Sequence, residues 1–363
     1  MGGVLGDLGT LLPLMAALIL INGLDVTLVL AGAGIFYIVS GLYFRIPMPV
    51  QPLKAVSAIA ISQGLSASVI GAAGLLMGGI LLFLSLTNLI FGVVKLFPKV
   101  VVRGIQLSIG LILLRKGVEL IFNEQIFING AQTSLTPGQF PIGIVLAILA
   151  LAVFVLFKFK FSKQNQGYPA SLALLTFGLG VGAIFGPIPS FGNLGPSSTE
   201  LVLPAAADFW IALTVLVIPQ LPLTQGNAVV GTWDTSRVYF EEQAKRVNPR
   251  SVTSSMGLAN IIVGLLGAMP MCHGSGGLTA HYKLGARTGG ANLMIGGLLL
   301  TGGLLLGYSS FSFIFIIPLA VLGVLLAIVG IYHMLIIRDL TQTSELAVAG
   351  SVAVATYVFS NLA

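Results

Sequence analysis

Long apolar segments recur along the whole chain, and they restrict its fold more than any other feature of the sequence. The mean hydropathy is +1.03, and charged residues make up only 8% of the chain. Such segments cross a bilayer as helices, because lipid cannot satisfy exposed backbone polar groups. No segment is polar enough to build a soluble domain, so we predict a single all-α polytopic membrane domain. The apolar start has no basic n-region or cleavage site, so we expect a first span rather than a signal peptide.

Thirteen helical segments are predicted from these runs. Their ranges are 8–21, 26–44, 52–65, 69–90, 100–114, 140–157, 168–186, 208–231, 251–268, 273–285, 291–309, 312–335 and 344–361. The segments 52–65 and 273–285 are too short to cross about 30 Å of hydrocarbon as helices alone. Each follows or includes an extended, proline-containing stretch. We therefore expect both to be half-helices that begin inside the membrane.

The basic residues predict the orientation of the chain. With the N-terminus in the cytoplasm, 14 of the 17 Lys and Arg residues fall on the cytoplasmic side. These are Arg45, Lys95, Lys99, Arg103, Lys158, Lys160, Lys163, Arg237, Lys245, Arg246, Arg250, Lys283, Arg287 and Arg338. Arg115 and Lys116 fall outside, and Lys54 lies within a span. Because cytoplasmic loops are enriched in Lys and Arg, we predict a multi-pass protein of the cell (inner) membrane with a cytoplasmic N-terminus. The net charge of +6 is then explained by the basic residues on the cytoplasmic side, and no nucleic-acid partner is expected.

Two halves of the chain resemble each other at a nearly constant offset. "MPVQPLKA", from Met48, returns as "MPMCHGSG", from Met269, and "GLLMGGILL" returns as "GLLLTGGLLL". We predict a first inverted repeat at 1–186 and a second at 187–363. The first half holds seven predicted elements, an odd number, so the second copy would be inverted, as in many transporters. The second half shows six elements, so a fourteenth helix would be missing from this chain.

The two half-helices follow repeat-related Met-Pro pairs. Pro52 suits the first turn of a helix, which makes Gln51 the expected N-cap. The aligned positions in the second half are Cys272 and His273. Helix starts present free N–H groups and the positive end of the dipole, so two facing starts can bind an anion. Gly274 and the two glycines that follow would let a ligand approach the backbone closely.

Two further polar clusters are expected to join these helix starts. One interrupts the span 208–231 and contains Gln220, Thr224, Gln225 and Asn227; its repeat partner contains Asp7 and Thr10. Amide groups offer hydrogen-bond donors without charge, which suits the oxygens of an oxyanion. The ranges 209–233 and 259–338 contain no Asp or Glu. Their absence argues against a sodium or amine carrier with carboxylates at the membrane midplane.

The stretches "GDLGTLLPL", "PMPVQPLKA", "PQLPLTQGNAV" and "MPMCHGSGGLTAHYKLGARTG" resemble the molybdate transporter family, a relative of the SulP sulfate permeases that lacks their STAS domain. The resemblance implies a seven-plus-seven inverted-repeat fold in which a core domain moves against a gate domain. It also implies that molybdate or sulfate binds between the broken third and tenth helices. The positions carried over by motif are Gln51 with the backbone after Pro52, Gln225, Asn227, His273, Gly274 and Ser275. We expect Leu53, Lys54 and Thr224 to complete this site.

Several of these residues also have simpler interpretations. His273 is either a ligand or proton carrier, or a buried histidine that is hydrogen-bonded to a carbonyl group. Lys54 either supplies charge to the anion or pairs with Asp7 or Asp234. Cys272 is expected to be a small packing residue, and as the single Cys it forms no internal disulfide. Adjacent Cys and His without a second pair are not a metal pattern, so no metal or cofactor is expected.

The sequence therefore predicts a secondary transporter of a tetrahedral oxyanion, with molybdate as the first candidate. Sulfate or another oxyanion stays open, because these anions share shape and charge. A passive anion channel also stays open. A nucleobase carrier of the same fold would have carboxylates in the spans 208–231 and 273–285, and an enzyme would need a catalytic constellation that the sequence lacks. Proton coupling through His273 and a homodimer are further expectations.

Overall fold

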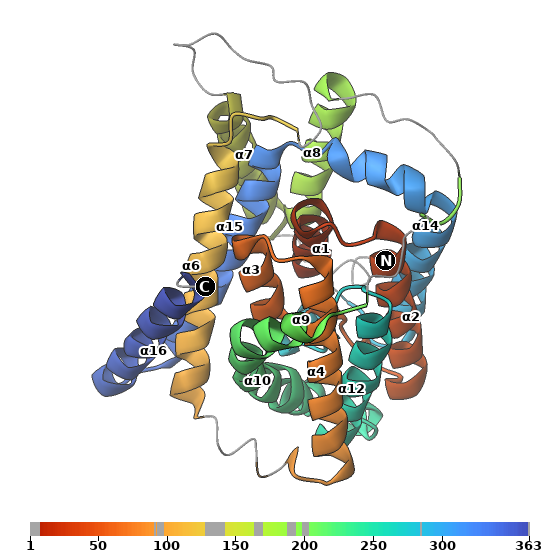
Figure 1. The fold of residues 1–363 in the computed structure, drawn as a ribbon, viewed down its shortest axis with the longest axis vertical. Coiled ribbons are helices and arrows are strands. Elements are labelled where there is room, and N and C mark those ends of the chain that lie inside the picture. The colour runs from red at the N-terminus through yellow and green to blue at the C-terminus, as the bar shows by residue number, and fades with distance from the viewer. Residues whose placement is uncertain are drawn as a thin grey trace.

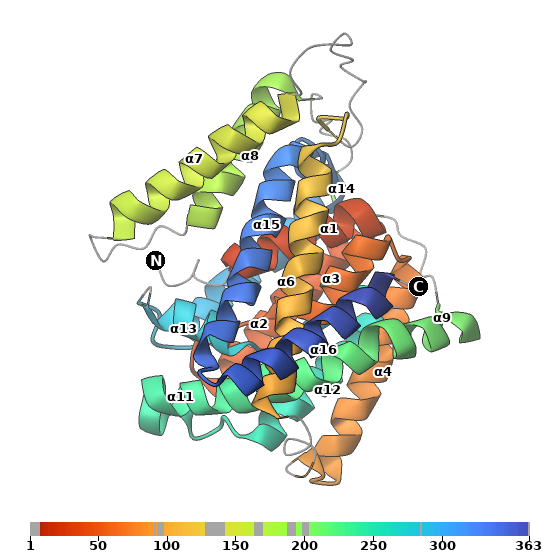
Figure 2. The same ribbon diagram turned by 90° about the vertical axis from the view of Figure 1, so that its left-hand side faces the viewer.

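The computed structural model describes residues 8–90, 92, 98–127, 142–162, 170–186, 194–197, 203–283 and 285–361. Nearly all of the secondary structure in these residues is helical, and it surrounds a single pair of two-residue strands (Figures 1 and 2). Six helical segments of the described residues are long and apolar enough to cross a membrane. The prediction of an all-α, multi-pass membrane protein is therefore confirmed.

The elements of the first half run from residue 8 to residue 185. They are α1 (Leu8–Asn22), α2 (Val26–Phe44), β1 (Gln51–Pro52), α3 (Lys54–Gln63), α4 (Ala67–Leu86), α6 (Lys99–Ile121), α7 (Ile142–Ser162) and α8 (Ala170–Phe185).

The second half begins with one long helical segment of changing pitch. This segment consists of α9 (Ala206–Ile211), η2 (Ala212–Val217), α10 (Ile218–Leu223), η3 (Thr224–Gly231), α11 (Thr232–Phe240) and η4 (Glu241–Ala244). The remaining elements are α12 (Pro249–Leu265), β2 (Met271–Cys272), α13 (Ser275–Lys283), α14 (Gly290–Phe315), α15 (Leu319–Leu335), η5 (Ile336–Asp339) and α16 (Thr343–Asn361).

Most predicted helix bounds agree with the structure to within a few residues, but three do not. The helix predicted at 100–114 continues to Ile121, because Glu119 forms ion pairs with Arg115 (3.0 Å) and Lys116 (3.4 Å) on its last turns. The two basic residues therefore lie on a helix rather than in a loop. The helix predicted at 208–231 continues into α11, and its π-helical turns η2 and η3 flank Pro219 and Pro222, which lack the N–H groups of a regular helix. The break predicted near 310 lies instead at Pro318.

The long helices pack in a reciprocal pattern. α2 packs along α14, α4 packs along α12, and α6 packs along α15. Glycines allow the last pair to approach closely: a Cβ added at Gly110 would lie 2.6 Å from the carbonyl oxygen of Gly330, and one added at Gly330 would lie 2.6 Å from that of Gly110. These two glycines lie 220 positions apart, close to the offset of 221 between the two Met-Pro pairs, and are therefore aligned in the repeat.

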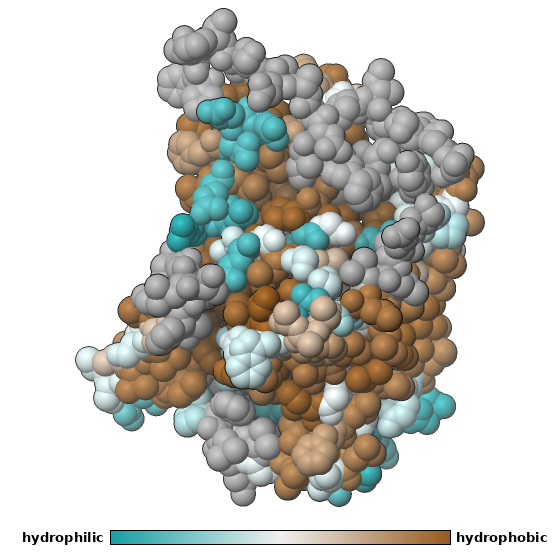
Figure 3. Space-filling model, in the orientation of Figure 1, coloured by the Kyte–Doolittle hydropathy of each residue, from teal (hydrophilic) through white to brown (hydrophobic). Residues whose placement is uncertain are grey.

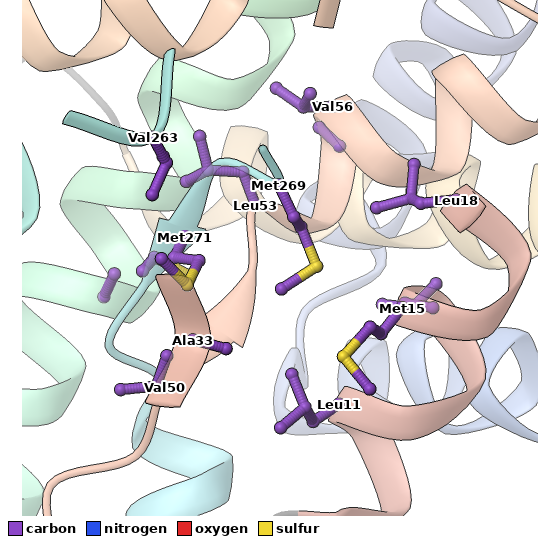
Figure 4. Packing of buried hydrophobic residues seen from close by; sticks show 14 of the residues in the cluster. Leu11, Met15, Leu18, Ala33, Val50, Leu53, Val56, Val263, Met269 and Met271 are labelled. Carbon is purple, nitrogen blue, oxygen red and sulfur yellow. The ribbon is translucent and has the colours of Figure 1, made fainter. Parts of the chain in front are cut away.

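The largest cluster of buried apolar residues surrounds the point where β1 and β2 meet. Figure 4 shows Leu11, Met15 and Leu18 of α1 on one side of Met269, and Leu53 near its other side. The outer surface is also apolar, as Figure 3 shows for one face. On α7, for example, Ile148 is 62% exposed and Phe159 is 68% exposed. A core of this kind under an apolar exterior is expected of a protein that faces lipid.

Candidate functional site

Two extended segments cross in the middle of the molecule and lead into the two short helices. β1 and β2 pair antiparallel, with Gln51 opposite Cys272 and Pro52 opposite Met271. The Leu53 N–H also donates to the carbonyl oxygen of Pro270 (2.9 Å). α3 and α13 start within a few residues of this pairing. The predicted breaks in both helices are therefore present in the structure.

The start of α3 differs from the prediction in one respect. Gln51 is not its N-cap: Gln51 lies in β1, and Leu53 occupies the N-cap position without a side-chain hydrogen bond. The physical reason is the pairing with Cys272, which keeps Gln51 and Pro52 extended so that the helix begins at Lys54. Gln51 is 1% exposed, so its side chain lies inside the molecule.

The first N–H groups of α3 are partly occupied by a protein side chain. The Ala55 and Val56 N–H groups donate to Oε1 of Gln220, at 2.8 and 3.3 Å. Nε2 of Gln220 in turn donates to Oγ1 of Thr224 (2.9 Å). The polar cluster within 208–231 therefore contacts the start of α3, as expected. At the first turn of α3, however, the Gln220 oxygen occupies the position at which the sequence predicts an anion. Thr224 orients this glutamine.

The start of α13 contacts the same cluster through other residues. Oγ of Ser275 donates to Oδ1 of Asn227 (2.8 Å). A Cβ added at Gly274 would collide with Oε1 of Gln51 and would lie 3.7 Å from Nδ2 of Asn227. The structure therefore brings Gln51, Asn227, Gly274 and Ser275 together, from four separate elements or loops.

Gln225 lies on η3, the same helical segment as Asn227, and its side chain is unusual. It is 1% exposed, and both Nε2 and Oε1 are buried with no hydrogen-bond partner among the described residues. A buried amide without partners is costly. Gln225 therefore has a donor and an acceptor that no described residue uses.

His273 has partners on both ring nitrogens. Nδ1 lies 2.8 Å from the carbonyl oxygen of Pro49, and Nε2 lies 3.1 Å from Oγ of Ser255. The ring is fully buried and packs against Phe36 (4.9 Å between centroids) and Phe44 (5.5 Å). This geometry matches the simpler of the two interpretations, a histidine that ties the two crossing segments together.

The structure gives the positions of most of the remaining predicted residues, but their contacts do not indicate a role in the site. Lys54 is the first residue of α3 and is half-buried, whereas Asp234, one of its two suggested partners, is exposed. The other suggested partner, Asp7, lies outside the described residues. Leu53 is fully buried, and the Pro52 carbonyl oxygen accepts a weak bond from Sγ of Cys272 (3.7 Å).

Sequence reasoning missed the residues that hold the crossing segments in place. Asn260 bonds the backbone of Met271 twice, through Nδ2 (2.7 Å) and Oδ1 (2.8 Å). Asn292 donates to the Met48 carbonyl oxygen (2.6 Å), and the Tyr37 hydroxyl donates to that of Val50 (3.0 Å). The signal that could have located the two asparagines is an Asn among apolar neighbours in a membrane helix, where it needs a specific partner.

Comparisons with known proteins agree with this arrangement. Residues 1–113 and 212–332 match the family described as molybdate transporter of MFS superfamily. Molybdate transporter 1 of Arabidopsis thaliana is 35% identical over 94% of this chain and 80% of its own length. Molybdate transporter 2 of the same plant is 32% identical over 95% of this chain and 80% of its own length.

A solved structure shows the same fold. The transmembrane domain of a cyanobacterial bicarbonate transporter, BicA, superposes with a TM-score of 0.74 at 19% identity, over 99% of this chain and 95% of that one. The family match covers most of the sequence, and the structure contains the two half-helices with the polar cluster beside them. The chain belongs to the molybdate transporter family.

Proposed function

We propose that this protein is a secondary transporter that carries molybdate across a membrane by alternating access. The observation that carries the proposal is the meeting of the α13 start with Gln51 and Asn227. On the same helical segment as Asn227, the buried amide of Gln225 has no partner among the described residues. The names of the two plant relatives, each at least 32% identical to this chain, support molybdate as the substrate.

The chemistry of the proposed site suits a tetrahedral dianion. Gln51, Gln225 and Asn227 provide amide N–H groups, and Ser275 orients the Asn227 amide through its Oδ1. The first turn of α13 provides backbone N–H groups and the positive end of a dipole. The absence of a side chain at Gly274 lets the Gln51 amide lie against the start of α13. Charge-free donors hold an anion less tightly than paired cations would, which permits release on the opposite side.

The other predicted positions take supporting roles in this proposal. Pro52, Leu53 and Lys54 form the start of α3 opposite α13, and Thr224 holds the Gln220 side chain that caps it. His273 ties β2 to the segment before β1. Because both of its ring nitrogens have partners, His273 has less support as a proton carrier than as a positioning residue.

The reciprocal packing of helices supports inverted repeats at 1–186 and 187–363. Under this division α4 and α14 are counterparts, as are α2 and α12. Each member of the first pair packs against a member of the second, α2 on α14 and α12 on α4. A pseudo-two-fold relation of this kind permits one group of helices to move against the other around the central site.

The substrate and the transport mode can be tested together in proteoliposomes. Labelled molybdate should accumulate saturably, and excess unlabelled molybdate should compete better than excess sulfate. Stronger competition by sulfate would make sulfate the substrate. Flux that follows the gradient without saturation would indicate a passive channel.

Uptake measured with and without an imposed proton gradient tests proton coupling. Light scattering coupled to chromatography tests the expected homodimer.

A further inference from the structure

A pocket of about 430 Å³ that combines apolar surface with several polar side chains lies between α2 and α12, which are in contact near the end of the molecule that carries residues 237–250. Ser40 and Tyr43 line it from α2, and Arg250, Ser254 and Ser255 line it from α12. None of its described lining residues belongs to the group around Gly274. It thus shares no lining residue with that group, although Ser255 in its wall contacts His273.

The pocket contains hydrogen-bond donors without matching acceptors. Ser40 is 1% exposed, and its buried Oγ has no hydrogen-bond partner in the described part of the chain. Arg250 takes part in none of the ion pairs found between described residues. None of the residues that line the pocket carries a carboxylate. An excess of donors in a partly enclosed space is typical of a site for an anion.

Neighbouring groups add to the positive potential of this pocket. The Arg246 guanidinium donates to the Tyr43 carbonyl oxygen (2.9 Å) and lies 5.9 Å from the centre of the Tyr43 ring. The pocket also adjoins the first turns of α12, a 17-residue helix whose N-cap is Asn248, so the positive end of that helix dipole is close to it.

Other hydroxyl groups of the pocket are already fixed by the protein. Oγ of Ser254 is hydrogen-bonded to Oγ of Ser85, and Oγ of Ser255 to Nε2 of His273. These contacts make the wall of the pocket rigid. They leave Arg250 and Ser40 as the groups that a bound molecule would engage.

We propose that this pocket binds a tetrahedral oxyanion, either the phosphate of an anionic lipid headgroup or a free anion. Arg250 would pair with its oxygens, and the Ser40 hydroxyl would donate to one of them. Val39 and Leu258 flank the pocket and are 53% and 57% exposed, so an apolar surface continues from it toward the lipid. This continuity favours the lipid source, since basic pockets between membrane helices bind lipid headgroups.

The test uses the full-length purified protein after removal of bound lipid. Binding of short-chain phosphatidylglycerol is measured by calorimetry for the parent, Arg250→Gln, Ser40→Ala and Arg338→Gln. Arg338 is an exposed cation on η5, so it controls for the change of net charge. We expect Arg250→Gln to weaken binding about tenfold, Ser40→Ala to weaken it less, and Arg338→Gln to leave it unchanged.

Inorganic phosphate, added in a second arm, distinguishes the two sources. If phosphate does not displace the lipid, the site takes a lipid headgroup. If phosphate displaces the lipid and shows the same dependence on Arg250 and Ser40, the site takes a free oxyanion. Equal affinity for phosphatidylglycerol in the parent, Arg250→Gln and Ser40→Ala proteins, with all three folded by circular dichroism, would overturn the proposal.

Discussion

At the scale of single residues, the Gln225 amide connects the fold to the proposed function. Both of its polar atoms are buried and lack partners in the described part of the chain, so it contributes little to stability and is available to a ligand. We predict that Gln225→Leu keeps or raises the melting temperature, because it replaces an unsatisfied amide with an apolar side chain of similar length. The same substitution should weaken molybdate binding about tenfold or more, measured by calorimetry.

Asn227 provides the matched comparison. Its Oδ1 accepts a hydrogen bond from Ser275, so Asn227→Ala should weaken binding and also lower the melting temperature by a few degrees. Unchanged molybdate affinity in both the Gln225 and the Asn227 variants would exclude these side chains from the site.

His273 illustrates the limit of sequence reasoning at this scale. Its position in a helix break indicated function, but the sequence could not show that Pro49 and Ser255 engage both ring nitrogens. Those contacts are made between segments far apart in the chain or across a helix break.

We predict that His273→Leu lowers thermal stability and transport together, because it leaves the Pro49 carbonyl group and the Ser255 hydroxyl unpaired at a cost of about 1–3 kcal/mol each. Thermal denaturation in detergent measures the first effect. A variant of parental stability that has lost only the pH dependence of uptake would instead identify His273 as the proton carrier.

At the scale of elements, the positions of both half-helices could be predicted, but their exact starts could not. Prolines at 49, 52 and 270 are local signals, and they placed the breaks correctly. The N-cap at Gln51 was wrong because the β1–β2 pairing is a long-range contact, which local sequence does not encode. The Gln220 cap on α3 was missed for the same reason, since 165 positions separate Gln220 from Ala55.

This cap gives a prediction for α3 as a unit. Gln220→Ala removes the acceptor for the Ala55 and Val56 N–H groups, so hydrogen exchange at these two amides should become faster. Gln220→Glu keeps an acceptor and should preserve their protection. The added negative charge should nevertheless weaken dianion binding, provided that the anion lies near this helix start. Equal exchange rates in the parent and Gln220→Ala proteins would show that the cap is unimportant in solution.

At the scale of the whole molecule, the helical nature of the described elements was predicted from hydropathy, whereas their packing was not. The Gly110–Gly330 approach, for instance, appears in the sequence only as two aligned glycines. The internal repeat of the sequence predicts that the two broken helices meet. In the structure they do so through β1 and β2.

The orientation also belongs to this scale and can be measured directly. Val238, in the basic region at 237–250, is 67% exposed, whereas the single native cysteine, Cys272, is buried. We predict that a membrane-impermeant maleimide labels Val238→Cys only after the membrane is permeabilised. It should label Glu124→Cys, beyond the opposite end of α6, in intact cells. The reverse pattern would mean that the N-terminus lies outside the cytoplasm.

The central claim, that the anion binds where Gly274 meets Gln51, is tested most directly by molybdate uptake into proteoliposomes for one pair of glycine variants. A Cβ at Gly274 would collide with the Gln51 amide, whereas one at Gly79 of α4 would meet nothing within 4 Å. The account predicts that Gly274→Ala reduces uptake at least about tenfold and that Gly79→Ala transports at the parental rate, with both proteins inserted in equal amounts. Parental uptake and affinity in Gly274→Ala would contradict it.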